Sequence, residues 1–263
     1  MTLLGGKVLL TGATGGIGTA IARALAAHGA QLLLTGRRVE VLEPLATEVG
    51  GTALACDLAD RAEVERLVSE VGNVDVLIAN AAHPASGVFT ELEPADIDRM
   101  LEVNLRAPVA LARGLAPGMM SRGRGHLVFI SSLSGKAASP ASAVYSATKF
   151  GLRGFALGAR EDLRPHGVGV SVVLPGFIRD AGMFAEAGVE LPRGVGTRTP
   201  HQVAAAVVQA IERNRAEVEV APMGLRVGAK FASVAPELAA AVSRKLGSDR
   251  IAAEVATGQR GKR

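Results

Sequence analysis

Short runs of apolar residues, mostly β-branched or leucine, alternate along the chain with longer stretches in which apolar residues recur every three or four positions. The short runs predict buried strands, and the longer stretches predict amphipathic helices. The predicted strands are Lys7 to Leu10, Gln31 to Leu34, Thr52 to Ala55, Val74 to Ala79, His126 to Ile130, Val168 to Leu174 and Glu217 to Val220. The predicted helices include Ile17 to His28, Arg61 to Val71, Ile97 to Leu115, Val144 to Leu163 and Pro200 to Asn214. This alternation is typical of an α/β protein with a doubly wound, Rossmann-like parallel sheet.

No linker, repeat or low-complexity tract interrupts the alternation of strands and helices. We therefore predict one domain over residues 1–220, followed by a C-terminal helical extension of the same domain over residues 221–263. Pro222 comes shortly after the last predicted strand, and a proline cannot donate to a continuing sheet ladder. A chain of 263 residues can bury a substantial core.

The N-terminal segment resembles a first strand and not a signal peptide, because Met1 to Leu4 lacks a basic region and runs directly into a glycine-rich turn. No run of about 18 apolar residues is present, so no transmembrane segment is expected. The single Cys56 excludes an internal disulfide framework, and we interpret it as a small buried apolar residue. These features indicate a cytoplasmic protein.

The composition excludes two further classes of site. Net charge is +4 and the isoelectric point is near 9.6, but no basic block with interleaved aromatic residues occurs. We interpret the charge as a solvated, arginine-rich surface and expect no nucleic-acid partner. The five histidines, at positions 28, 83, 126, 166 and 201, are too scattered to predict a metal site.

A glycine-rich string follows the first predicted strand and leads directly into the first predicted helix. It reads Thr11-Gly12-Ala13-Thr14-Gly15-Gly16-Ile17-Gly18. Glycines let the backbone turn tightly and approach a pyrophosphate, which then faces the N–H groups at the start of the helix. This context favours a dinucleotide-binding loop over an ordinary glycine turn.

Two arginines, Arg37 and Arg38, follow the second predicted strand, where an NAD site usually carries an acidic residue. A guanidinium offers a planar fork to a 2′-phosphate and no acceptor to a 2′-hydroxyl. The pair therefore favours NADP(H) over NAD(H). The alternative is that both arginines only solvate the start of the next helix.

Tyr145 is the only tyrosine, and Lys149, one of six lysines, lies four residues later in a predicted helix. Residues at i and i+4 share a helix face. Ionising a phenol of pKa ~10 at neutral pH requires roughly 4 kcal/mol, and a positive charge ~4 Å away supplies a similar amount in partly screened protein. The pair is therefore a candidate general acid/base. Taken alone, the spacing favours a tyrosine over the core with a lysine beside it, and the motifs around the pair change that interpretation.

The glycine string, Ser132 thirteen residues before Tyr145, and the spacing Tyr145-x-x-x-Lys149 together resemble the single-domain branch of the short-chain dehydrogenase/reductase family, over roughly residues 5 to 220. The resemblance implies that Tyr145 is the general acid/base and that Lys149 binds the nicotinamide ribose and lowers the pKa of the tyrosine. It implies that Ser132 hydrogen-bonds the substrate carbonyl and that Asn104 supports a water-linked proton relay.

The resemblance also implies contacts with the cofactor. Asp57, in Cys56-Asp57-Leu58, matches the family's adenine contact. The implied cofactor-binding residues are Gly12, Thr14, Gly15, Gly16, Ile17, Gly18, Arg37, Arg38, Asp57, Leu58, Asn80, Ala81, Tyr145, Lys149, Pro175, Gly176 and Ile178. Alternatives are that Asp57 caps the following helix and that Asn104 is an ordinary polar helix residue. Ser131 and Ser134 compete with Ser132, and the spacing to Tyr145 favours Ser132.

The sequence departs from the family's pattern at two places. Ala79-Asn80-Ala81-Ala82 stands where the family usually has Asn-Asn-Ala-Gly, which narrows the space beside the cofactor. The segment after Pro175-Gly176 lacks the threonine that commonly reaches the cofactor, so that contact would come from backbone or Arg179. The glycines at positions 12, 15 and 18 also fit a longer epimerase-like branch, but only 114 residues follow Lys149, which is short for a second domain.

We therefore expect an NADP(H)-dependent oxidoreductase that interconverts a carbonyl and a secondary alcohol. One alternative is a nucleotide-sensing protein without catalysis, whose expected signature is the loss of Tyr145 or Lys149. The other is an epimerase or isomerase with a retained cofactor, which would leave NADPH absorbance unchanged on turnover.

We expect the segment Phe177 to Thr199 to form a lid over the site. Its apolar residues suggest either an apolar substrate or a lid packed on its own core. They are Met183, Phe184, Val189, Leu191 and Val195, and the loop after Ala82 adds Val88 and Phe89.

For assembly, we expect a homodimer through the two long helices that carry Asn104 and Tyr145, with a tetramer as the alternative. The C-terminal extension is expected to cover the surface through which last strands would pair. A further alternative is that its apolar residues Phe231, Val234 and Leu238 dock on a membrane surface or reach over a neighbour's active site.

Overall fold

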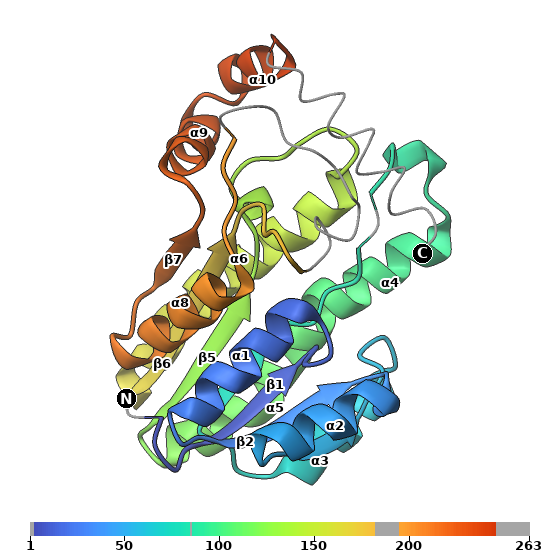
Figure 1. The fold of residues 1–263 in the computed structure, drawn as a ribbon. Helices are drawn as coiled ribbons and strands as arrows, with labels where there is room; N and C mark the ends of the chain where they lie inside the picture. Colours follow the sequence, from blue (N-terminus) through green and yellow to red (C-terminus); the bar gives the residue numbers. More distant parts are fainter. Residues whose placement is uncertain (1–2, 85, 182–194, 246–263) are drawn as a thin grey trace.

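The computed structural model describes residues 3–84, 86–181 and 195–245, and its centre is a seven-stranded parallel sheet (Figure 1). The strand order is β3-β2-β1-β4-β5-β6-β7, with every neighbouring pair parallel. The strands are β1 (Lys7–Thr11), β2 (Gln31–Gly36), β3 (Thr52–Ala55), β4 (Val76–Ala79), β5 (Gly125–Ile130), β6 (Val168–Pro175) and β7 (Glu217–Val220). The predicted doubly wound α/β fold is confirmed.

Helices cover both faces of the sheet. One face carries α1 (Gly16–Ala27), α2 (Val39–Val49) and α8 (Pro200–Glu212), and the other carries α3 (Arg61–Val71), α5 (Ala107–Ser121) and α6 (Ala143–Leu163). Shorter elements are α4 (Pro94–Leu101), η1 (Phe89–Glu91), η2 (Glu102–Arg106), η3 (Leu133–Gly135) and η4 (Arg164–His166). The C-terminal extension forms α9 (Met223–Val234) and α10 (Pro236–Lys245).

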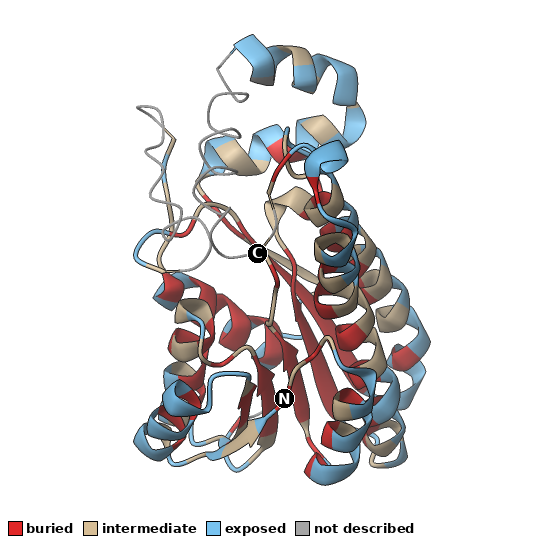
Figure 2. Cartoon of the chain, turned by 90° about the vertical axis from the view of Figure 1, so that its right-hand side faces the viewer, coloured by how far each residue is buried: buried red, intermediate tan, exposed pale blue. Residues whose placement is uncertain are grey.

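The central strands β1, β4, β5 and β6 are buried on both sides, which explains their nearly continuous apolar sequences (Figure 2). In β1, Val8 and Leu10 enter the core under α1, α2 and α8, whereas Leu9 enters the core under α3, α5 and α6. The same alternation holds in β5, where Val128 faces the first core and Phe129 the second. Side chains that alternate along a strand thus fix which helices lie on which face.

The predicted helix from Ile97 to Leu115 is wrong as one continuous α-helix. It consists of α4, the π-helical turn η2 and α5. Pro108 has no N–H to donate to the carbonyl of Asn104, so the α-helical ladder is interrupted there, and Ala107 donates instead to Glu102, five residues back. The fourth strand begins at Val76 and not Val74, because Asp75 pairs with Lys7 partly through its carboxylate (3.1 Å).

The extension lies beyond the carboxyl end of β7, above α6 and the ends of the central strands (Figure 1). Its described part, α9 and α10, therefore does not run alongside β7, which is the edge strand. The expectation that the extension covers the surface beside the last strand is wrong for these residues.

No helix among residues 3–84, 86–181 and 195–245 is long and apolar enough to cross a bilayer.

Candidate active site

The predicted site residues gather at the carboxyl ends of β1, β4, β5 and β6. The chain crosses to opposite faces after β1 and β4, which are neighbours in the sheet, so their ends bound the switch point at which α/β sheets bind ligands. Most of the predicted residues follow these four strands directly: the glycine string follows β1, Asn80 follows β4, Ser132 follows β5, and Gly176 follows β6.

The glycine string forms a tight turn, and the space around its glycines differs from one position to the next. Gly12 has φ +65°, and a Cβ at this position would lie 2.7 Å from Cα of Ala81. A Cβ on Gly18 would lie 2.1 Å from the carbonyl oxygen of Gly12. These two glycines are therefore required by close packing of the turn. Gly15 meets only an ordinary contact, at 3.6 Å, and faces more open space.

The N-terminus of α1, which starts at Gly16, suits an anion. Its N-cap, Gly15, provides no side-chain hydrogen bond, and its first turn contains no acidic residue. The first N–H groups of a helix have no partner within the helix, and they carry partial positive charge. The turn and the helix start therefore fit the pyrophosphate of a dinucleotide, as the sequence predicts.

Asn80 holds the glycine turn in place. Its side-chain amide donates to the carbonyls of Thr11 (3.0 Å) and Gly12 (3.1 Å), and its backbone N–H donates to the Thr11 hydroxyl (3.0 Å). Ala81 donates to the same hydroxyl at 3.1 Å. Among its described hydrogen bonds, the Asn80 side chain thus supports the loop backbone, a role distinct from the predicted contact with the cofactor.

The two arginines after β2 differ in their partners. Both are exposed, and Arg38 donates through Nη2 to the carbonyl of Thr14 at 2.7 Å. Arg37 contributes positive potential that helps to hold the pKa of Asp57 below its usual value. Arg38 is therefore hydrogen-bonded to the glycine turn, whereas the charge of Arg37 influences Asp57, which follows β3.

Asp57 does not cap α3, so the alternative role for it is wrong. The cap is Asp60, whose carboxylate accepts from the N–H groups of Ala62 and Glu63. Asp57 instead accepts from Ala59 N–H (3.0 Å) and pairs with Arg99 (2.8 Å). Desolvation raises the pKa of Asp57, but Ala59 and Arg99 outweigh it and hold that pKa below its ordinary value.

Two of the predicted cofactor contacts carry side chains that belong to the core. Leu58 is buried in the core under α3, α5 and α6, and Ile178 is buried in the core under α1, α2 and α8. Ile178 also forms an isolated parallel bridge with Arg198. These residues can reach a cofactor only through their backbone atoms. Gly176 packs tightly, since a Cβ there would lie 2.9 Å from Cβ of Ala221.

Ser132 and Tyr145 meet at the end of β5. The Ser132 hydroxyl caps η3 by accepting from Ser134 N–H at 3.1 Å, and it lies 3.5 Å from the carbonyl of Pro175. Desolvation raises the pKa of Tyr145 to about 12, while a hydrogen bond with Ser132 acts in the opposite direction. Ser131 points elsewhere, because its hydroxyl donates to the Lys149 carbonyl at 2.9 Å. The choice of Ser132 over Ser131 thus has a geometric basis.

Lys149 is buried beside Tyr145 on the same face of α6, as the i, i+4 spacing predicts. Its Nζ lies 5.6 Å from the centre of the Tyr145 ring and donates to the carbonyl of Ile130 at 3.0 Å. Burial lowers the pKa of Lys149 to about 8. Desolvation is the largest influence on the Tyr145 pKa in this structure, so a lowering of that pKa by Lys149 stays a prediction.

Asn104 lies in the π-helical turn and is fully buried against His83. His83 lies in the segment between β4 and η1 and was not predicted as a partner of Asn104. Burial and the nearby Arg99 lower the pKa of His83. Its buried Nε2 has no hydrogen-bond partner within the described part of the chain. Only the tertiary structure shows this pairing, since the two residues are 21 positions apart.

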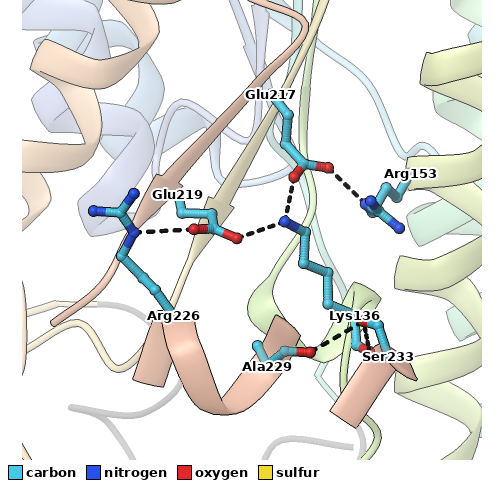
Figure 3. Close-up of polar contacts among 7 residues, drawn as sticks. All are labelled: Lys136, Arg153, Glu217, Glu219, Arg226, Ala229 and Ser233. Atoms are coloured by element: carbon cyan, nitrogen blue, oxygen red, sulfur yellow. Dashed lines mark hydrogen bonds and ion pairs between the residues drawn. The ribbon is translucent and has the colours of Figure 1, made fainter. Parts of the chain in front are cut away.

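A buried ionic cluster surrounds Lys136, which directly follows η3 (Figure 3). Lys136, which is 6% exposed, contacts the carboxylates of Glu217 and Glu219. Glu217 also binds Arg153 of α6 (2.6 Å), and Glu219 binds Arg226 of α9 (2.9 Å). The cluster joins the Ser132 loop to α6, β7 and the extension. Its sequence signal is the Glu-Val-Glu alternation of β7, which places both carboxylates on one face of the strand.

The predicted lid lies partly outside the described residues. Met183, Phe184, Val189 and Leu191 belong to this part, and Val195 is partly buried. Val88 and Phe89 are exposed.

Within the described chain, no group of three or more His, Cys, Asp or Glu side chains could hold a metal ion.

Comparison with known proteins identifies the family. The family model for short chain dehydrogenase matches residues 6–190. Ketoacyl reductase HetN of Nostoc sp. is 40% identical over 228 residues, which cover 83% of this chain and 79% of that protein. The 3-oxoacyl-(acyl-carrier-protein) reductase FabG of Rickettsia prowazekii is 34% identical over 179 residues, with coverages of 67% and 74%.

Solved structures agree. A metagenomic short-chain oxidoreductase in complex with NADP superposes with a TM-score of 0.71 at 34% identity and covers 85% of this chain and 100% of that one. A short-chain dehydrogenase from Sphingobium yanoikuyae in complex with NADPH has a TM-score of 0.77 at 27% identity, with coverages of 90% and 95%. This chain belongs to the short-chain dehydrogenase/reductase family of oxidoreductases, as its motifs predict.

Proposed function

We propose that this protein uses NADPH to reduce the 3-oxo group of an acyl thioester to a secondary alcohol, with Tyr145 as the proton donor. The observation that carries the proposal is the meeting of Ser132, Tyr145 and Lys149 at the carboxyl end of β5. The substrate class is supported by the names of two relatives, a ketoacyl reductase and a 3-oxoacyl reductase.

NADP(H) is supported by two observations. Arg37 and Arg38 follow β2, where a carboxylate would bind the ribose hydroxyls of NAD. Two similar structures contain NADP or NADPH. The turn from Gly12 to Gly18 would hold the pyrophosphate, and Lys149 would hold the nicotinamide ribose. The bound cofactor supplies the hydride.

The protein's own residues supply position and a proton. Ser132 Oγ–H would donate a hydrogen bond to the substrate carbonyl and fix its orientation. As the carbonyl carbon gains the hydride, the Tyr145 phenol transfers its proton to the carbonyl oxygen. A pKa raised to about 12 keeps that proton on Tyr145 at neutral pH, which suits the reductive direction. Lys149, whose pKa is lowered to about 8, would return a proton to the phenolate.

The test is a substrate panel followed by NADPH absorbance. Acetoacetyl-coenzyme A should be reduced with one NADPH consumed per secondary alcohol formed, and a saturated acyl thioester should not be reduced. Net consumption of NADPH excludes an epimerase with a retained cofactor. Loss of NADPH with other ketones but not with 3-oxoacyl thioesters would contradict the substrate class and leave the reaction type standing.

We also propose a homodimer through α5 and α6. Phe150 on α6 and Leu101 at the end of α4 are 42% and 40% exposed, which is high for large apolar side chains in the centre of a fold. Gly154 and Gly158 follow Phe150 at spacings of four on the same face of α6, and a Cβ at either would meet nothing within 4 Å, so a second copy can approach this face closely. Multi-angle light scattering of the full chain should give a dimer, and a monomer or tetramer would contradict the proposal.

A further inference from the structure

The two helices of the C-terminal extension expose a stripe of large apolar side chains. We call these six residues the apolar stripe: Met223, Val227, Phe231, Val234, Leu238 and Val242. The first four recur every three or four positions and share one side of α9, and Leu238 and Val242 share one side of α10, which follows a break in the helix at Ala235. Six of the thirteen large apolar side chains exposed in the described chain lie in these twenty residues, so the stripe is a concentrated feature and not a scatter of single residues.

Helix α9 has its amphipathicity reversed relative to a helix packed on a core. The side turned to the protein consists of small or partly buried residues, with Ala229 buried and Leu225 partly buried. The large residues face solvent, and the exposed fractions of Met223 and Val234 are 66% and 86%. A helix that buried its apolar face against its own domain would show the opposite arrangement.

The orientation of α9 is fixed by polar contacts. Arg226 binds Glu219 of β7 at 2.9 Å, and the Ser233 hydroxyl donates to the carbonyl of Lys136 at 3.1 Å (Figure 3). Both contacts lie on the side of α9 away from the apolar stripe. They hold the helix with its apolar side outward, so the exposure of the apolar stripe follows from the way α9 is bound to the domain.

The charge of the protein is concentrated in the same segment. Residues 221–263 contain eight lysines and arginines and three acidic residues, a net charge of +5. Residues 1–220 contain 21 basic and 22 acidic residues, a net charge of −1. In the described part, Lys230, Arg244 and Lys245 are exposed on α9 and α10. Four of the eight basic residues, Arg226, Lys230, Arg244 and Lys245, therefore belong to the described helices α9 and α10, against one acidic residue, Glu237.

We infer that α9 and α10 dock on the surface of an anionic lipid bilayer, with the apolar stripe inserted among the acyl chains and the basic residues at the headgroups. Outward apolar side chains bordered by lysine and arginine are what a bilayer surface binds. A second copy of the chain would bring two positive segments together, which charge repulsion disfavours. The inference does not depend on the reaction that the enzyme catalyses.

The experiment is co-sedimentation of the full chain with vesicles of phosphatidylcholine and phosphatidylglycerol in equal parts, compared with vesicles of phosphatidylcholine alone. Binding to the anionic vesicles should be at least about tenfold tighter, since each basic residue near the surface adds attraction to the anionic headgroups. This difference should shrink as salt is added, because salt screens the attraction.

Variant Val234→Asp places a carboxylate in the centre of the apolar stripe and should weaken binding at least about tenfold, the effect of losing one buried apolar side chain. Val41→Asp on α2 is the matched control, since Val41 is also exposed and lies outside the extension; it should bind like the unmutated protein. Circular dichroism verifies that both variants fold.

Three results would overturn the inference. These are failure of the full chain to bind anionic vesicles, equal binding to anionic and neutral vesicles, and equal loss of binding in both variants. If Val234→Asp instead converts an oligomer to a smaller species in light scattering while the unmutated chain does not bind vesicles, the stripe belongs to an interface between copies of this chain.

Discussion

The side chain of Asn104 holds the backbone of His83 through both of its polar atoms. Asn104 Oδ1 accepts from His83 N–H at 2.6 Å, and Asn104 Nδ2 donates to the His83 carbonyl at 3.1 Å. The amide therefore fixes the segment after β4 to the π-helical turn, close to Ala81 and the glycine turn. The proton relay implied by the family resemblance would have to use the Asn104 backbone, whose carbonyl receives no hydrogen bond from Pro108.

Asn104→Ala should therefore destabilise the fold. It leaves the buried N–H and C=O of His83 without their partner, and each such group costs about 1 to 3 kcal/mol. We expect a loss of at least about 2 kcal/mol in the free energy of unfolding, measured with urea. Asn73→Ala is the control, because Asn73 also accepts a side-chain hydrogen bond, from Arg122, but is exposed; it should lose less than about 1 kcal/mol. Equal losses in the two variants would contradict the structural role of Asn104.

Lys149 should give the stability a characteristic dependence on pH. Its pKa is lowered from 10.5 to about 8 in the folded protein, so protonation of the buried amine opposes folding at neutral pH. Between pH 8 and 10.5 the folded state releases this proton before the unfolded state does, and this opposition disappears as pH rises. The variant Lys149→Met has no amine at this position and therefore lacks this dependence of stability on pH. The stability of the unmutated protein relative to this variant should therefore rise from about pH 7 to about pH 10.

Urea denaturation at both pH values measures this difference, and Lys230→Met, at an exposed position, is the control that should show no such rise. Measurements should not go above pH 10, the ordinary pKa of a tyrosine, because the Tyr145 pKa is raised to about 12 and its titration lowers stability above pH 10. A relative stability that is flat or falls over this range would contradict the buried, destabilising ammonium.

Arg37 and Arg38 should contribute differently to cofactor choice. Arg37→Ala should weaken NADPH roughly ten- to a hundredfold and leave NADH nearly unchanged, since a charge-assisted fork to phosphate contributes about 1.5 to 3 kcal/mol. Arg38→Ala should weaken both cofactors, because Arg38 supports the carbonyl of Thr14 in the glycine turn. Calorimetric titration measures both. The assignment fails if the unmutated protein binds NADH as tightly as NADPH.

The ionic cluster at Lys136 should stabilise the structure mainly through its buried members. Glu219→Gln removes one of two carboxylates beside a buried ammonium and should cost about 1 to 3 kcal/mol of unfolding free energy. Arg226→Met removes the more exposed partner of the same carboxylate and should cost less than about 1 kcal/mol. Thermal or urea denaturation of the two variants distinguishes them, and the reverse order would contradict the buried cluster.

The sequence predicted those features that depend on local patterns. The strands followed from continuous apolar runs, and Tyr145 and Lys149 share a helix face because their spacing of four fixes it. The glycine turn was predictable because its position between a strand and a helix is a local property. Helix α2 after Arg38 and the helical extension were also foreseeable in outline.

The features that were not predicted depend on contacts between distant segments. The pairing of Asn104 with His83 spans 21 residues. The break in the helix at Asn104 is the exception, because Pro108 lies inside the predicted helix and is a local signal for it. The partners of Asp57 and Lys136 lie 42 and 83 residues away, at Arg99 and Glu219. The tyrosine pKa depends on desolvation by the whole fold, which the spacing to Lys149 alone does not reveal.

The most direct test of the proposed function is the effect of Tyr145→Phe on single-turnover reduction of acetoacetyl-coenzyme A by bound NADPH. The phenylalanine keeps the ring and removes only the phenol proton, so binding of NADPH, measured by fluorescence, should persist. The rate of NADPH oxidation should fall by about 10² to 10⁴, the range for loss of a general acid. A rate within about tenfold of the unmutated protein, with NADPH bound, would contradict the role of Tyr145 as the proton donor.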